Sequence, residues 1–246
     1  MRPLLTATAA AALLLLPACR ALPAAMRSVL PLTAALPPPG TPAAPLRAVL
    51  PDLQAARFAV YLPASLPAPG PGDRYLVTAQ ASPDTYEMSI HLTNATAPLG
   101  GGGTSSWSGF LGLVRGGPAV WVERQAAQDA VLPPARGTPG SLALPGGWTA
   151  WRYPSGAVLW QEGGWRYGVS ADTPAEAGRI AVSMAEIFGR SGSPLGRGIR
   201  GEVVRDFGAD GGSSLVLWTI GGYAYEVWGR DAAAFPLLRA LVRVEG

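Results

Sequence analysis

The sequence predicts an α+β fold of antiparallel β-sheets with helices packed on one face, built from repeated β-β-β-α units. Two segments, 158–169 (VLWQEGGWRYGV) and 216–227 (VLWTIGGYAYEV), repeat one pattern without a gap. A strand pattern precedes each copy and a helical pattern follows it. The chain is 48% hydrophobic and has eight tryptophans, so it can bury a core and is not globally disordered.

Residues 1–19 predict an export signal. Arg2 gives a positive start, and residues 4–16 are an unbroken run of apolar and small residues that stops just before Cys19, the only cysteine. The run is too short for a membrane-spanning helix, which needs about 20 residues. Its end, LPAC, resembles the lipobox of bacterial lipoproteins. This implies lipid attachment at Cys19, at the outer face of the cytoplasmic membrane; simple secretion and an uncleaved anchor remain the alternatives.

Residues 20–51 are rich in alanine and proline and predict an extended, poorly ordered tether. Proline fixes φ and removes a hydrogen-bond donor, and residues 37–39 are three consecutive prolines. In polyproline geometry, at about 3.1 Å per residue, roughly 30 residues would reach about 90 Å. Such a tether would separate a lipid anchor from a folded body; low-complexity sequence without a role is the alternative.

Residues 58–132 are predicted to form an N-terminal α+β unit. Segment 58–67 opens it, and segments 74–81 and 85–93 alternate apolar and polar residues on either side of a short Ser-Pro-Asp loop. This pattern indicates a β-hairpin.

Two more strands are expected further along this unit, at 110–114 and 120–123, the second running into a short helix through Val131. Segment 133–145 contains four prolines and is predicted to be the internal boundary of the chain.

Residues 146–246 are predicted to form the duplicated region, in which strands 148–153 and 202–207 lead the two hairpins. The Gly-Gly pair in each copy supplies the positive φ that a two-residue hairpin turn requires. Alternation places three apolar or aromatic residues of each second strand on one face, which predicts a core-facing stripe. An exposed aromatic platform for sugars or lipids is the alternative. The two stripes are Trp165, Tyr167 and Val169, and Tyr223, Tyr225 and Val227.

A helix is well marked after the first hairpin. Thr173 and Glu176 form a capping box with Pro174 at the first helical position, and apolar residues recur at helical spacing until Gly189. A second helix is expected within 232–242, with Pro236 as a candidate start. A third, degenerate β-β-β-α unit is expected over 74–132.

The sequence offers little for catalysis. His91 is the only histidine and lies in a strand pattern, so no site built from histidine and cysteine ligands is expected, and no cofactor. The G-x-S-x-G motif of a serine nucleophile is absent, because 189–193 (GRSGS) ends in serine. All nineteen basic residues are arginines scattered along the chain, and the net charge is only +3, so no nucleic-acid partner is expected.

The part from Trp148 to the end resembles uncharacterised exported, lipoprotein-like proteins of Gram-positive bacteria. The shared features are L-x-W-x-x-x-x-x-Y-x-V before a helix and a V-x-L-P-x-x-L-P opening, here residues 60–67. A weaker similarity, in the strand–helix rhythm, is to the lipoprotein-carrier and sigma-regulator sensor group; it implies a hydrophobic cavity for acyl chains.

We therefore expect a non-catalytic, lipid-anchored binding or scaffolding protein of the cell envelope, with a lipid, glycan or protein ligand. One alternative is a carrier or sensor of lipid-like ligands in a curved sheet, and another is an envelope enzyme acting on a cell-wall polymer. A carrier would line a cavity with the aromatic stripes, whereas a scaffold would pack those rings solidly. An enzyme would show convergent ionisable groups in a pocket.

Overall fold

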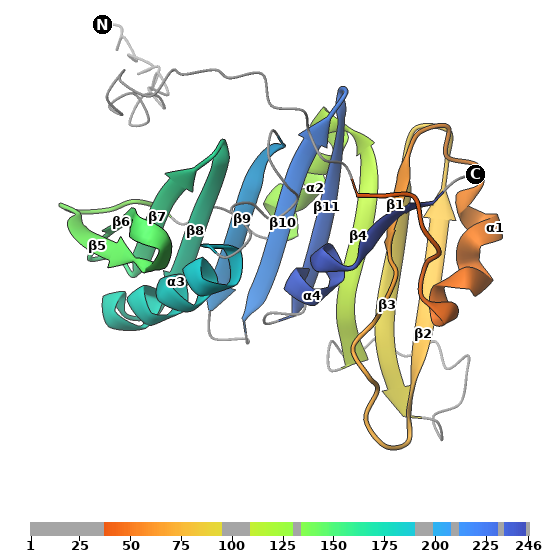
Figure 1. The fold of residues 1–246 in the computed structure, drawn as a ribbon, viewed down its shortest axis with the longest axis horizontal. Coiled ribbons are helices and arrows are strands. Elements are labelled where there is room, and N and C mark those ends of the chain that lie inside the picture. The colour runs from red at the N-terminus through yellow and green to blue at the C-terminus, as the bar shows by residue number, and fades with distance from the viewer. Residues whose placement is uncertain are drawn as a thin grey trace, which may run out of the picture. The chain divides into compact units, whose positions relative to one another are not determined.

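The computed structural model describes residues 37–94, 109–129, 134–189, 199–207, 212–230 and 234–244. They form a mixed α+β fold around a ten-stranded sheet with strand order β2-β3-β4-β11-β10-β9-β8-β7-β6-β5, beside a two-stranded sheet of β1 and β12 (Figure 1). Neighbouring strands are antiparallel except β8 and β9, which run parallel. The strands are β1 (Val60–Pro63), β2 (Asp73–Ala81), β3 (Tyr86–Asn94), β4 (Phe110–Pro118), β5 (Gly140–Leu144), β6 (Trp148–Arg152), β7 (Ala157–Glu162), β8 (Trp165–Ala171), β9 (Arg200–Phe207), β10 (Ser213–Ile220), β11 (Tyr223–Arg230) and β12 (Leu241–Val244).

Helices cover both faces of the large sheet, so the expectation of helices on one face is wrong. Helices α3 (Pro174–Gly189) and α4 (Ala234–Arg239) lie on one face, and α2 (Ala119–Asp129) lies on the other (Figure 1). The reason is that the central strands carry apolar side chains on both faces. Val203 and Val216 join the main core, whereas Val204 and Leu215 pack against α2. Each face needs its own cover to remove these side chains from water.

Both Gly-Gly hairpins form as expected. Gly163 and Gly164 have φ of 56° and 91°, and Gly221 and Gly222 have φ of 60° and 87°. The two hairpins also share one register: Trp160 pairs with Tyr167 in β7–β8, and Trp218 pairs with Tyr225 in β10–β11. Positive φ at both turn positions is the backbone conformation that matches the twist of the flanking strands.

The aromatic stripes belong to the core, as the alternation predicts. Tyr167 and Tyr225 are 1% and 3% exposed, and Trp165 and Trp218 are fully buried. The Trp160 and Tyr167 rings stack with their centroids 4.8 Å apart and their planes 3° apart. Burial of rings of this size is a main stabilising contribution in a chain whose described part has no disulfide.

Helix α3 confirms the N-cap predicted at Thr173 and the start at Pro174. The backbone N–H of Glu176 donates to Oγ1 of Thr173 at 3.2 Å, which satisfies one of the otherwise unpaired donors of the first turn. The apolar positions at helical spacing lie against β7 and β8 and are buried. They are Ala177, Ala181, Met184, Ala185 and Phe188.

The predicted hairpin at 74–93 is confirmed as β2 and β3, but the next elements differ from the expectation. Strand β4 continues to Pro118, and the expected strand 120–123 is the first turn of α2. The short apolar run there is ambiguous by periodicity. The helix prevails because Val122 and Ala126, four residues apart, are buried together.

Two segments further along the chain, 133–145 and the end of 232–242, contain strand residues that the sequence pattern does not predict. The proline-rich segment 133–145 contains β5, because its prolines flank the run Gly140–Leu144 rather than interrupt it. The helix expected within 232–242 is limited to α4, and the chain then enters β12, which pairs with β1. The run after Pro236 is long enough for both a short helix and a four-residue strand.

The last part of the expected tether is folded. A 3₁₀ helix, η1 (Ala44–Val49), leads into α1 (Leu50–Leu53), and Leu46 and Leu53 are buried. The N–H of Gly40 donates to the carbonyl of Arg243 at 3.1 Å. This segment folds because its leucines and valine share one apolar face that packs beside β2. Residues 20–36 and Cys19 lie outside the described residues.

No helix of the described part is long and apolar enough to cross a membrane.

Candidate functional site

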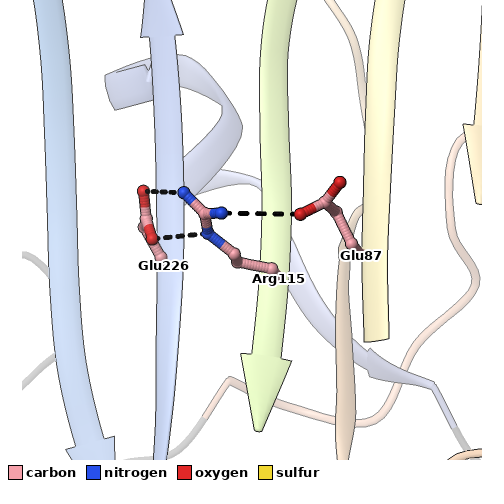
Figure 2. Close-up of polar contacts among 3 residues, drawn as sticks. All are labelled: Glu87, Arg115 and Glu226. Carbon is pink, nitrogen blue, oxygen red and sulfur yellow. Dashed lines mark hydrogen bonds and ion pairs between the residues drawn. The ribbon is translucent and has the colours of Figure 1, made fainter. Parts of the chain in front are cut away.

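Three charged residues lie in a row across three neighbouring strands of the large sheet. The strand register pairs Glu87 of β3 with Arg115 of β4, and Arg115 with Glu226 of β11. Figure 2 shows the guanidinium of Arg115 between the two carboxylates. We call Glu87, Arg115 and Glu226 the charged triad.

The triad is held by short, directional contacts. Nε of Arg115 donates to Oε2 of Glu226 at 2.7 Å, and Nη2 donates to Oε1 at 3.0 Å, which makes the pair bidentate. Nη1 donates to Oε2 of Glu87 at 3.4 Å. Bidentate guanidinium–carboxylate pairs are among the strongest hydrogen-bonded arrangements in proteins because both partners are charged and their shapes match.

Burial differs sharply between the two carboxylates. The side chains of Glu226 and Arg115 are 0% and 4% exposed, whereas that of Glu87 is 29% exposed. Helix α2 packs against β4, β10 and β11 on this face, where Ala126 contacts the cluster containing Trp228, two residues along β11 from Glu226. Glu87 is therefore the triad member that reaches solvent.

The electrostatics of the triad follow from this burial. Desolvation raises the pKa of Glu226 above its ordinary value; the hydrogen bonds and positive charge of Arg115 lower it, and the negative charge of Glu87 raises it. Burial outweighs the arginine, so this carboxyl is harder to ionise than one in water. The arrangement acts chemically as a cross-strand clamp, because Arg115 occupies both oxygens of the buried carboxylate.

A shallow polar hollow of about 210 Å³ lies next to the triad. It is lined by β2 and β3 and includes the carboxylate of Glu87, the hydroxyls of Thr78 and Ser89, and the amide of Gln80. These groups provide hydrogen-bond donors and acceptors and have little apolar surface to bury a ligand. The hollow is therefore suited to weak polar contacts rather than to enclosing a substrate.

The sequence reasoning did not identify the triad. Glu87, Arg115 and Glu226 are 28 and 111 residues apart, so their proximity depends on strand register. The sequence contains one local signal. Arg115 lies between a valine and a glycine, and Glu226 lies between a tyrosine and a valine, each within a strand pattern where a charged residue is unusual.

His91 occupies a half-buried strand position, as expected. It lies on the same face of β3 as Glu87, with its ring 5.3 Å from that of Phe110. Burial lowers the pKa of His91. Within the described ranges no group of three or more His, Cys, Asp or Glu residues could hold a metal ion. The predicted lipid-attachment residue, Cys19, lies outside those ranges.

The aromatic rings pack against one another. Tyr61 meets Tyr225 edge-on at 4.8 Å, and Trp218 stacks on Tyr225 at 5.6 Å. Neither the polar hollow nor a second one, beside α3, is lined by these rings. Several polar atoms on the aromatic residues are nevertheless buried without a hydrogen-bond partner, among them Nε1 of Trp160, Trp165 and Trp218, and the hydroxyl of Tyr167.

Searches of family models, of curated proteins and of solved structures found no match to this chain.

Proposed function

We propose that the protein is a non-catalytic binding or scaffolding protein of the cell envelope, attached to the outer face of the cytoplasmic membrane through a lipid on Cys19. One observation carries the proposal: in each hairpin a buried tryptophan stacks on a tyrosine, Trp160 on Tyr167 and Trp218 on Tyr225. These rings line neither the polar hollow nor the hollow beside α3. A body whose aromatic residues are used for packing offers its surface, and not its interior, to partners.

The charged triad fits this role as a structural element. Arg115 joins β3, β4 and β11 by side-chain bonds. A buried bidentate pair specifies register across strands that are distant in sequence. It does not leave the buried carboxylate available to a substrate.

The anchor is tested by Cys19→Ala in the full chain. We expect loss of fatty-acid labelling and release from the membrane fraction, since two or three acyl chains give stable attachment and none remain without the thiol. Unchanged labelling and unchanged membrane partition would contradict the anchor.

A carrier of lipid-like ligands is the second candidate, favoured by the unpartnered polar atoms of Trp160, Trp165, Tyr167 and Trp218. Buried polar atoms are normally hydrogen-bonded, and a polar head group could satisfy them. Native mass spectrometry of the Cys19→Ala protein separates the candidates, because no covalent lipid is present. We expect the bare polypeptide mass; a stoichiometric lipid-like adduct would favour the carrier.

We further propose that β6-β7-β8-α3 and β9-β10-β11-α4 are duplicated β-β-β-α units, with β2-β3-β4-α2 as a third, degenerate copy. The shared Gly-Gly turns and the equivalent Trp–Tyr pairs support this. Replacing Gln161-Glu162 by the Thr-Ile of the second copy should then change the free energy of unfolding by less than about 1 kcal/mol. Loss of cooperative unfolding in that variant would count against equivalence.

A further inference from the structure

Strand β5 ends the ten-stranded sheet and pairs only with β6 among the described residues (Figure 1). Its sequence, Gly-Ser-Leu-Ala-Leu, has no charged residue and no proline. Natural edge strands are usually protected by charges, prolines or a covering segment, because their unpaired N–H and C=O groups can pair with another chain. Strand β5 has none of the first two protections.

The opposite edge of the sheet shows the contrast. Helix α1 lies beside β2 (Figure 1), and both η1 and α1 contact this strand. This folded segment contains the buried Leu46 and Leu53. One edge is therefore covered by the chain itself, whereas the other presents a short apolar strand.

A second hollow, of about 350 Å³, lies beside this edge, between β5, β6 and the first turns of α3. Its walls are mainly apolar and include Leu142, Ala175 and Val182. A Cβ added at Gly178 would lie 3.8 Å from Cδ2 of Leu142 and from Cδ of Arg152, so this glycine leaves the helix close to both side chains. The hollow and the edge strand form one continuous surface.

The hollow carries positive charge and no carboxylate. Arg152 of β6 and Arg179 of α3 both line it, and both are exposed. Arg152 pairs across the ladder with Gly140, whose missing side chain leaves the arginine open toward the edge. Two arginines beside an apolar surface are complementary to a carboxylate next to aliphatic side chains.

We propose that β5 and this hollow bind an extended segment of a partner protein, in which acidic and aliphatic residues alternate on one face. The segment adds to β5 as a further strand, so its backbone is held by β5 and every second side chain reaches the hollow. Its carboxylate meets Arg152 and Arg179, and its aliphatic side chain packs on Leu142. This inference rests on the proposed binding role and specifies its partner.

A second copy of the chain fits this surface less well. Pairing two β5 edges about a two-fold axis would place no carboxylate at either hollow, because β5 itself has no acidic residue. The arginines would then remain without anionic partners.

The test is selection from a phage-displayed library of random heptapeptides on the full chain in detergent. We expect enrichment of peptides in which an aliphatic residue stands two positions from an aspartate or glutamate, so that both side chains lie on one face of the added strand. Fluorescence anisotropy with an enriched peptide should show at least about tenfold weaker binding to Arg152→Ala/Arg179→Ala. The matched control, Arg124→Ala on the exposed side of α2, should bind as tightly as the parent.

Two further readouts make the result specific. Hydrogen exchange should slow in the amides of 140–144 when the peptide binds, because strand addition uses them. In the Arg152→Glu/Arg179→Glu variant, selection should switch to basic peptides. Absence of acidic–aliphatic enrichment, equal binding by the arginine variants, or no protection of β5 would each overturn the proposal. None of these outcomes bears on the Cys19 anchor, whose test is membrane partition.

Discussion

At the residue scale, stability depends on which buried polar atoms have partners. The hydroxyl of Tyr86 donates to the carbonyl of Tyr61 at 3.2 Å and accepts from the N–H of the same residue. Arg115 and Glu226 satisfy each other across two strands. The hydroxyl of Tyr167, in contrast, is buried without a partner. Similar residues therefore differ in what their substitution costs.

The charged triad gives the first prediction. Arg115→Ala leaves the fully buried Glu226 without its counter-charge, so we expect the free energy of unfolding to fall by about 3–5 kcal/mol in urea titrations. The control is Arg166→Ala, which removes an exposed ion pair with Glu202 and should cost less than about 1 kcal/mol. Equal, small losses in both variants would show that Arg115 is not clamping a buried charge.

The raised pKa of Glu226 gives a pH dependence whose sign can be worked out. Because burial raises the folded-state pKa of this carboxyl, its contribution to stability is fully present below the unfolded-state pKa and is lost as the pH rises through the folded-state value. The glutamine side chain of Glu226→Gln cannot ionise, so this variant does not lose stability in this way as the pH rises. We therefore expect the free energy of unfolding of Glu226→Gln, relative to the parent, to increase from about pH 4 to about pH 7. If the difference in the free energy of unfolding between Glu226→Gln and the parent did not change with pH across this range, the raised pKa of Glu226 would be contradicted.

Variants at the buried tyrosines distinguish the contribution of the ring to stability from that of the hydroxyl. Tyr167→Ala and Tyr225→Ala should each lower the free energy of unfolding by roughly 2–5 kcal/mol through lost burial and a new cavity. Tyr167→Phe keeps the ring and removes an unpartnered hydroxyl, so it should be neutral or stabilising. Tyr86→Phe should cost about 1 kcal/mol, since its hydroxyl is bonded. Thermal melts within a degree of the parent for both alanine variants would instead favour a ligand platform.

At the element scale, local chemistry decides the hairpins and α3, whereas packing decides the rest. The Gly-Gly turns and the Thr173 cap lie within a few residues of what they specify, so the sequence predicts them correctly. The segment 120–123 has the same apolar character in a strand or a helix. Burial of Val122 under the sheet, which no local pattern reveals, makes it helical.

The close approach of β4 to the core gives an element-scale prediction. A Cβ at Gly116 would lie 2.6 Å from Cε1 of Tyr86 and 2.7 Å from Cδ1 of Tyr225. Because both rings are buried and cannot easily move, Gly116→Ala should destabilise by about 1–3 kcal/mol. Gly140→Ala, at the sheet edge, meets only a backbone oxygen 4.0 Å away and should change stability little. Comparison of the two urea midpoints checks this.

At the scale of the whole molecule, one sheet combines strands from both expected halves of the chain. Strand β4, from 58–132, pairs with β11, from the last part of the chain. Pairing between strands that are more than a hundred residues apart in the sequence depends on the total apolar area buried on the two faces of the sheet, not on any short motif. The triad exists only through the register of β3, β4 and β11, so the sequence alone does not predict it. The buried aromatic stripes each lie within a single hairpin, so the local pattern does predict them.

The covered edge of this sheet yields the last prediction, which concerns truncation. Removing residues 1–36 keeps every described helix and strand, so we expect the shortened chain to unfold cooperatively. Removing 1–53 also deletes η1 and α1, including Leu46 and Leu53, and exposes the edge of β2. By analogy with alanine substitution, loss of each buried leucine should lower the free energy of unfolding by about 2–5 kcal/mol. The open edge of the nine-residue strand β2 should also promote association between chains. We expect a lower melting temperature and light scattering in the longer truncation only; two truncations with identical melts and identical monomeric behaviour would show that 37–53 is dispensable to the fold.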